Sequence, residues 1–252
     1  MGMKNTLHEK IVAIVEARMT SSRLPGKVLF PAAGKPLLGH LVDRLKMVPS
    51  VAEIVLATTI NSADEPLVEF AREYGVTSFR GSEHDVMARV LEASEAVSAD
   101  VIVSVTGDCP LVDPLIVEQV VQLFLINPCE YATNGHLHTF PEGMGVQVYK
   151  YETLKRSAAM TSDSGEREHV TLHIRRHPEL FCHLYLPAPL DQYWPELHLS
   201  LDEVADYELL KKIIEHFNEV TPLFSCRDIV LLLKNRPEWV SINEHVVVKR
   251  FT

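Results

Sequence analysis

Three cations lie close together in residues 17–27, a loop with the sequence ARMTSSRLPGK. They are Arg18, Arg23 and Lys27, and the small residues between them leave backbone N–H groups free to bind an anion. Such a loop suits a triphosphate, which needs several cations and N–H donors around it. The alternative is a solvated basic loop, since the GxxxxGK[ST] spacing of a Walker A loop is absent. The complete lack of Asp and Glu from residue 17 to 42 favours the phosphate site.

An acidic residue follows a predicted buried strand in the segment Thr106-Gly107-Asp108-Cys109-Pro110. Asp108 would lie at the carboxyl edge of a parallel sheet, where open α/β folds bind their ligands. A carboxylate there can hold Mg²⁺ on the phosphates of a nucleotide. The competing interpretation is an ordinary turn, because Gly-Asp and Cys-Pro both favour turns. Asp113 is better explained as a helix cap, because Pro114 follows it at the first helical position.

A second acidic residue ends the alternating segment at residues 197–202, LHLSLD. A period of two places His198, Ser200 and Asp202 on one face of a predicted strand and three leucines on the other. If this strand lies near the one before Asp108, the two carboxylates can share one metal ion. The alternative is that Asp202 caps the helix that follows.

The histidines offer a weaker metal hypothesis. His169 and His173 have the i, i+4 spacing of HExxH, but the sequence is HVTLH and lacks the glutamate. His136 and His138 alternate on a predicted strand. No third ligand stands at a convincing spacing, so surface or structural histidines are the simpler interpretation.

The order of predicted elements indicates an α/β fold with a mostly parallel sheet and helices on both faces. In the first half, strands are predicted at 11–15, 53–59, 76–79 and 101–106, and helices at 37–47, 65–73, 85–96 and 114–125. The second half contains a predicted small inserted subdomain at 131–186, with helices at 151–159 and 165–175. Further elements are predicted as a strand at 197–201, helices at 204–219 and 226–234, and a strand or cap at 244–251.

Bulk composition excludes several classes of protein. The 252 residues carry a net charge of -10, which disfavours binding to nucleic acid. No apolar run approaches the ~20 residues that cross a bilayer, and the polar N-terminus does not resemble a secretory signal. The four cysteines form no CxxC pair, which is typical of reduced thiols in the cytoplasm. We therefore expect a cytoplasmic protein with no membrane or nucleic-acid partner.

Seven motifs together resemble the cytidylyltransferase family, which includes the CMP-KDO and CMP-sialic acid synthetases, and most of all its spore-coat polysaccharide branch. They occur in the family's order up to about residue 219, and they read ARMTSSRLPGKVL, GKPLL, FRGSEHDVMARV, TGDCPLVDP, FPEGMGVQVY, REHVTLHI and LSLDEVADYELL. The resemblance implies one domain over residues 1–252 with the nucleotide-diphospho-sugar transferase (GT-A-like) fold. It also implies a homodimer built partly through residues 131–186.

The same resemblance implies roles for individual residues. Arg23, Lys27 and Asp108 would be catalytic, and Asp108 and Asp202 would bind Mg²⁺. The remaining contacts to the nucleotide would come from Ala17, Arg18, Ser22, Arg80, Gly81, Ser82 and Thr106. The acceptor side would contain the segment 142–147 with Gln147, together with Glu168 and His169.

The implied reaction is Mg²⁺-dependent transfer of CMP from CTP to a small acidic sugar, with release of pyrophosphate. The sequence departs from the family pattern at three places. Glu16 stands before the cationic loop, Met-Gly-Val-Gln at 144–147 replaces Leu-Asp-Val-Glu, and Leu-Asp-Glu-Val-Ala-Asp at 201–206 replaces Val-Asp-x-x-Glu-Asp. Two of them leave the acceptor open, including a phosphonate or another non-sugar acid. A GT-A glycosyltransferase is the rival enzyme, although Asp108-Cys109-Pro110 lacks the DxD motif. A non-catalytic nucleotide-binding protein is the rival outside enzymes.

Overall fold

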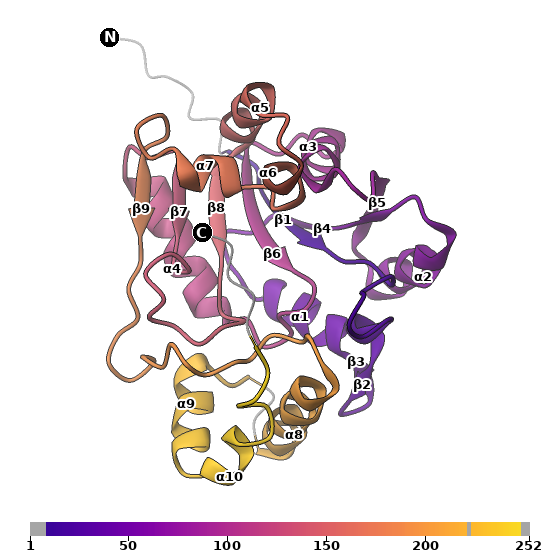
Figure 1. Cartoon of the computed structure of the whole chain (residues 1–252), viewed down its shortest axis with the longest axis vertical. Coiled ribbons are helices and arrows are strands. Elements are labelled where there is room, and N and C mark those ends of the chain that lie inside the picture. The colour runs from indigo at the N-terminus through magenta and orange to yellow at the C-terminus, as the bar shows by residue number, and fades with distance from the viewer. Residues whose placement is uncertain (1–8, 221–222, 248–252) are drawn as a thin grey trace.

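A seven-stranded sheet organises the chain, in a computed structural model that describes residues 9–220 and 223–247 (Figure 1). The strand order is β5-β4-β1-β6-β8-β7-β9. The strands are β1 Ile11–Glu16, β4 Glu53–Thr59, β5 Thr77–Gly81, β6 Val101–Thr106, β7 Tyr131–Thr133, β8 Gln147–Lys150 and β9 His183–Tyr185. A separate two-stranded ribbon pairs β2 Pro31–Ala32 with β3 Lys35–Pro36.

The first half of the sheet is parallel and buried on both faces. β1 pairs with β4 on one side and β6 on the other, and β5 adds to β4. Every residue of β1 except the last is buried, which matches its β-branched sequence. The helices that connect these strands are α1 Leu37–Leu45, α2 Glu65–Tyr74, α3 Val86–Ala96 and α4 Pro114–Ile126. The predicted α/β architecture with a mostly parallel sheet is therefore confirmed.

Residues 131–186 extend the same sheet. β8 runs antiparallel to both β6 and β7, and β9 runs parallel to β7. The helices of this region are α5 Tyr151–Met160, α6 Ser164–Glu168 and α7 Leu172–Arg176. They lie on the same side as α3 in Figure 1, and α5 and α6 both contact α3.

Two apolar cores cover the two faces of the sheet. The larger core joins the sheet to α1, α2 and α4, and it continues into the C-terminal helices α8 Val204–Val220 and α9 Cys226–Lys234. The smaller core packs α3, α5 and α7 against the other face. The last helix is α10 Pro237–Val240. Among the described residues, no helix combines the length and the apolar character needed to span a bilayer.

Asp113 links the main sheet region to the C-terminal helices. Its Oδ1 accepts from Leu115 N at 2.8 Å, which confirms the predicted cap of α4. Its Oδ2 accepts from Cys226 N at 2.6 Å, at the first residue of α9. Asp113 is almost fully buried, so one carboxylate satisfies the amino ends of two helices inside the core.

Three predictions of local structure are wrong. The helix expected at 165–175 is two short helices, because Val170 has a positive φ of 43° that no right-handed helix allows. Residues 197–201 form one isolated bridge, Glu142 to His198, because their other N–H groups bond to separate loops. His136 and His138 lie in a turn rather than on a strand. Of the strand or cap predicted at 244–251, residues 244–247 form no strand, and residues 248–251 lie outside the described residues.

Gly143 allows the segment 197–201 to pass close to the loop before β8. Its φ is 91°, and a Cβ built there would lie 2.6 Å from the carbonyl carbon and oxygen of Leu199. Gly145, two residues further along, is different, because a Cβ added there would meet no neighbouring atom within 4 Å. A side chain is therefore excluded at Gly143 but has space at Gly145, although both glycines lie in one loop.

We expect Gly143→Ala to lower the free energy of unfolding by at least about 2 kcal/mol, because it combines a strained φ with a backbone clash. Gly145→Ala is the matched control and should change the free energy of unfolding by no more than about 0.5 kcal/mol. Urea denaturation measures both. Equal losses in the two variants would contradict this account of the loop.

Candidate active site

The buried Lys27 ammonium joins two carboxylates. Its Nζ lies 3.1 Å from Asp108 Oδ2 and 3.2 Å from Asp202 Oδ1, and it also donates to the carbonyl oxygen of Leu201. Arg23 Nη2 adds a salt bridge of 2.7 Å to Asp202 Oδ1. The residues predicted as the catalytic and metal-binding set, Arg23, Lys27, Asp108 and Asp202, are therefore brought together.

Electrostatic pairing fixes the charges of this cluster. Burial opposes the charged form of Lys27, but the charges of Asp108 and Asp202 outweigh burial and raise the pKa of Lys27 above its usual value. Burial likewise opposes ionisation of Asp108, and the Lys27 charge and hydrogen bonds outweigh it, so the pKa of Asp108 is lowered. Both groups are therefore ionised at neutral pH.

Gly107 brings the ends of β1 and β6 into close contact. Its N–H donates to the Glu16 carbonyl at 2.8 Å, and a Cβ on Gly107 would lie 2.9 Å from the Ala17 Cβ. Thr106 Oγ1 then donates to Asp108 Oδ1 at 2.6 Å and orients that carboxylate. The glycine before Asp108 thus has a packing role that brings the acid to the cationic loop.

A fully buried carboxylate, Asp64, anchors the start of the cationic loop. Its Oδ1 accepts from Met19 N at 2.7 Å, and its Oδ2 accepts from Thr58 Oγ1 and from the Thr59 N–H and hydroxyl. Burial opposes ionisation, but these hydrogen bonds outweigh it and lower the pKa of Asp64. Sequence reasoning missed Asp64, because an isolated acid before a helix carries no signal of a contact with a distant loop.

The arrangement of Asp108 and Asp202 fits a divalent cation. Both carboxylates point at one position, which the Lys27 ammonium occupies with two contacts near 3 Å. Carboxylate oxygens are the ligands that Mg²⁺ prefers. Asp202 contributes its side chain to this cluster, and its backbone N–H donates to Asp206 Oδ2 at 3.0 Å.

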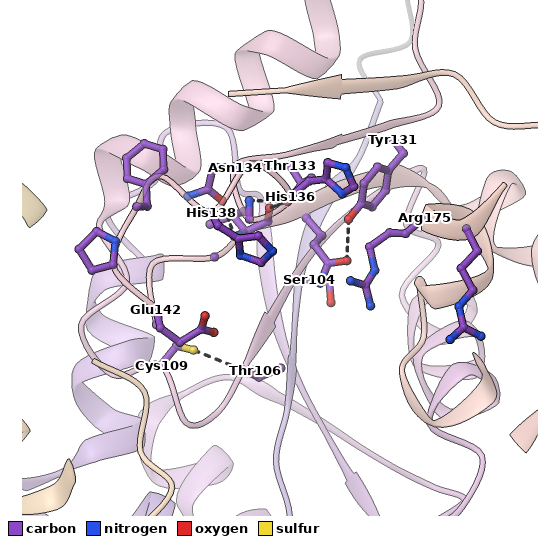
Figure 2. Close-up of a pocket in the computed structure, with 18 residues that line it drawn as sticks. Ser104, Thr106, Cys109, Tyr131, Thr133, Asn134, His136, His138, Glu142 and Arg175 are labelled. Carbon is purple, nitrogen blue, oxygen red and sulfur yellow. Dashed lines mark hydrogen bonds between the residues drawn. The ribbon is translucent and has the colours of Figure 1, made fainter. Parts of the chain in front are cut away.

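A cavity of about 460 Å³ opens beside Asp108, since Thr106 and Cys109 both line it. Figure 2 shows Glu142 and Cys109 at one end and Tyr131 and Arg175 at the other. Its lining comes from β6, β7, the loop before β8, and α7, and its main polar side chains are Ser104, Thr106, Thr133, Asn134, His136, His138, Glu142, Gln147, Arg175 and Arg176.

Gln147 occupies a fixed orientation in this cavity. Its Oε1 accepts from Tyr131 Oη at 2.9 Å and from the Thr171 hydroxyl. With the oxygen engaged in this way, the amide nitrogen remains as a donor for a ligand. Arg175 and Arg176 add positive charge at the same cavity, against the single carboxylate of Glu142.

The other predicted site residues take different positions. Arg18 and Ser22 are exposed on the cationic loop. Arg80 binds the β4–α2 connection, through Thr59 O, Asn61 O and a 2.7 Å salt bridge to Glu65.

Gly81 lies against Arg89, where a Cβ would be 2.9 Å from its Cγ, and Ser82 Oγ accepts from Asp85 N at 3.0 Å. Glu168 and His169 lie at the end of α6 and do not line the cavity.

Sequence reasoning also missed the pair Arg175 and Arg176. Two adjacent arginines in a mostly acidic protein were the available signal for an anion site. Their position at the cavity depends on the break at Val170, because a continuous helix over 165–175 would place the two side chains in other directions.

Comparisons with known proteins show the family of this chain. A family model described as cytidylyltransferase matches residues 12–229. The spore coat polysaccharide biosynthesis protein SpsF of Bacillus subtilis is 33% identical over 90% of this chain and 95% of its own length. A solved structure of a cytidylyltransferase from Leptospira borgpetersenii has a TM-score of 0.88 and 33% identity, with 96% of this chain and 100% of that chain covered.

The 3-deoxy-manno-octulosonate cytidylyltransferase of Trichlorobacter lovleyi matches a shorter stretch. It is 35% identical over 47% of this chain and 46% of its own length. The chain belongs to the cytidylyltransferase family and is a nucleotidyltransferase. The predicted family and the predicted nucleotide-diphospho-sugar transferase fold are confirmed.

Glu16, the acid that departs from the family pattern, lies behind the site and accepts from Ser104 Oγ at 3.1 Å. Burial raises the pKa of Glu16 from its ordinary 4.5 to about 7, despite the opposing effects of Arg89 and Ser104. Its negative charge beside a phosphate loop is therefore reduced at neutral pH.

A raised carboxyl pKa predicts a stability change with pH. Between about pH 5 and 7 the folded protein holds a proton on Glu16 that the unfolded chain releases, so the free energy of unfolding falls as pH rises through this window. We expect Glu16→Gln to remove a fall on the order of 2 kcal/mol, measured by denaturation without divalent metal. Glu95→Gln, at an exposed glutamate, should leave the fall in place. Parallel pH profiles for the wild type and Glu16→Gln would contradict the raised pKa.

Proposed function

We propose that this protein transfers CMP from CTP to a small acidic acceptor and releases pyrophosphate, in the synthesis of a surface polysaccharide or glycoconjugate. The observation that carries the proposal is the Lys27 cluster at the edge of the cavity. Thr106 lines the cavity and donates to Asp108 Oδ1 at 2.6 Å, so one hydrogen bond joins the cavity wall to the charged cluster.

The nucleotide side uses the cationic loop. The triphosphate is bound by three cations: Arg18, Arg23 and Lys27. In the free protein, Arg23 and Lys27 form ion pairs with Asp108 and Asp202, and the phosphates replace these carboxylates as their partners. Asp108 and Asp202 hold Mg²⁺, which neutralises phosphate charge when it is bound. The family membership supports CTP as the donor.

The acceptor side uses the cavity, whose volume suits a small molecule. Arg175 and Arg176 favour a carboxylate or phosphonate, and the Gln147 amide adds a neutral donor. The T. lovleyi relative is named for 3-deoxy-manno-octulosonate, a sugar acid, which supports this class of acceptor.

The proposed reaction is one in-line displacement. An acceptor oxygen forms a bond to the α-phosphorus as the bond to the β-phosphate oxygen breaks, and pyrophosphate leaves. Arg23 and Lys27 stabilise the charge that grows on the leaving group, and the cavity holds the acceptor in line.

We also propose that the enzyme is a homodimer that uses residues 131–186 and that it works in the cytoplasm, where CTP is available. Analytical ultracentrifugation of the purified chain tests the dimer, since a monomer mass at micromolar concentration would exclude it.

The central experiment measures pyrophosphate release with Mg²⁺ and each of the four NTPs against acidic sugars and phosphonates. We expect release with CTP and one acidic acceptor, and Asp108→Asn should lower the rate by at least about 100-fold. Asp191→Asn, at an exposed carboxylate away from the site, is the matched control.

Each other outcome of this experiment has a clear meaning. Tight CTP binding without release from any acceptor would favour the non-catalytic nucleotide-binding alternative. Turnover of a nucleotide-sugar donor would favour the glycosyltransferase. Failure to bind CTP would overturn the proposal.

The acceptor assignment gives a separate prediction. Arg175→Gln should raise the KM for the acidic acceptor by about 10-fold or more, because it removes a charged hydrogen-bond donor. The KM for CTP should stay within about two-fold, since the triphosphate binds the other end of the site. Arg227→Gln, at an exposed arginine, controls for the charge change. A matched rise in both KM values would contradict this division of the site.

A further inference from the structure

A second group of metal-type ligands lies on α6 and α7, apart from Asp108 and Asp202. Glu166, His173 and His177 each offer one atom that can bind a metal ion, and each of these atoms lies within 4.8 Å of the other two. Glu166 and His173 are buried, and the His177 side chain is 36% exposed. The group is therefore built into the protein but remains open to solvent on one side.

Glu166 fixes the ring of His173. Its Oε2 lies 2.9 Å from His173 Nδ1, and Thr161 Oγ1 donates to the same oxygen at 2.5 Å. Nδ1 of His173 is thus engaged with a carboxylate. Nε2 of the same ring is buried and has no hydrogen-bond partner among the described residues. A buried polar nitrogen without a partner costs about 1–3 kcal/mol, so a ligand for it would be stabilising.

His177 repeats this arrangement at the i+4 position. Its Nδ1 lies 2.8 Å from Glu179 Oε1, which leaves its Nε2 as the other coordinating atom. The two imidazole rings have centroids 4.4 Å apart and are tilted by 48°. Two histidines whose Nδ1 atoms each face a carboxylate form the carboxylate–histidine pattern that supports metal ligation in proteins.

We propose that Nε2 of His173 and Nε2 of His177 bind a divalent transition-metal ion of the zinc class, with Glu166 and Glu179 orienting the two rings. Imidazole nitrogen suits Zn²⁺, Ni²⁺ and Cu²⁺, whereas Mg²⁺ prefers oxygen ligands. The site is therefore chemically distinct from the Asp108–Asp202 pair. The solvent-exposed side of His177 gives water access to the remaining coordination positions.

The site adjoins the acceptor cavity through one cation. Arg176 Nη1 lies 3.5 Å from the other Glu166 oxygen, and Arg176 also lines the cavity. On its remaining side His173 packs edge-on against Phe181, at a centroid distance of 6.0 Å. The side chain of Arg176 is 46% exposed, so this guanidinium lies at the surface beside the proposed site.

Tag-free, chelator-treated protein titrated with Co²⁺ tests the proposal, with visible absorption reporting nitrogen ligation and Zn²⁺ displacing the signal. With saturating Mg²⁺ present to fill the Asp108–Asp202 pair, we expect one equivalent of Co²⁺ to bind. His177→Ala and Glu166→Gln should each weaken affinity by about 10-fold to 100-fold. His245→Ala, at an exposed histidine elsewhere, should have no effect.

Controls separate this site from the magnesium site. Saturating Mg²⁺ should not displace Co²⁺, and Asp108→Asn should bind Co²⁺ like the wild type. The melting temperature of His177→Ala without metal should match that of the wild type, because its side chain is partly exposed. Absence of saturable Co²⁺ binding, or equal affinity in His177→Ala, would overturn the proposal.

Discussion

A buried ammonium between two carboxylates is the constraint around which the active-site half of this protein is organised. Lys27, Asp108 and Asp202 can lie together in the protein only because their charges compensate each other at about 3 Å. They come from the loop after β1, the turn after β6 and the segment before α8. The fold must bring these three segments to one edge of the sheet.

Backbone contacts achieve this convergence. Gly107 holds the ends of β1 and β6 together, and Leu201 N donates to the Asp108 carbonyl at 2.8 Å. Gly143 allows the segment that carries Asp202 to cross the loop before β8. The motifs shared with the family thus contain glycines and hydrogen-bonding positions that carry the charged residues to the site.

The sequence predicted the parallel half of the sheet well, because long buried strands and amphipathic helices there have strong periodicity. It also predicted that Asp108 and Asp202 converge and that Asp113 caps α4. It failed at 197–201, where the alternation of leucines with polar residues predicted a paired strand, whereas His198 and Ser200 are buried like the leucines and only an isolated bridge forms. Here the two buried polar side chains contact each other at 2.7 Å, and strand pairing depends on backbone that is distant in the sequence.

The region around the cavity was less predictable for a related reason. Its cavity is lined by turns at 134–146 and by α7, so its geometry depends on positive φ angles at His138, Gly143 and Val170. The place of a single residue such as Arg175 in the cavity can be predicted only when the conformation of those turns is known. Gln147 is the exception, since the motif singled it out and the structure places it in the cavity, in contact with Tyr131 and Thr171.

Asp64 has a consequence for nucleotide binding by the cationic loop, the role proposed for that loop above. Because its buried carboxylate holds Met19 and both threonines at the end of β4, the start of the cationic loop is ordered before any ligand arrives. The entropy of arranging this part of the loop is lost once, during folding, and need not be lost again at each encounter. For the proposed triphosphate site, preorganisation of this kind makes the affinity depend on a buried carboxylate that lies outside the cationic loop.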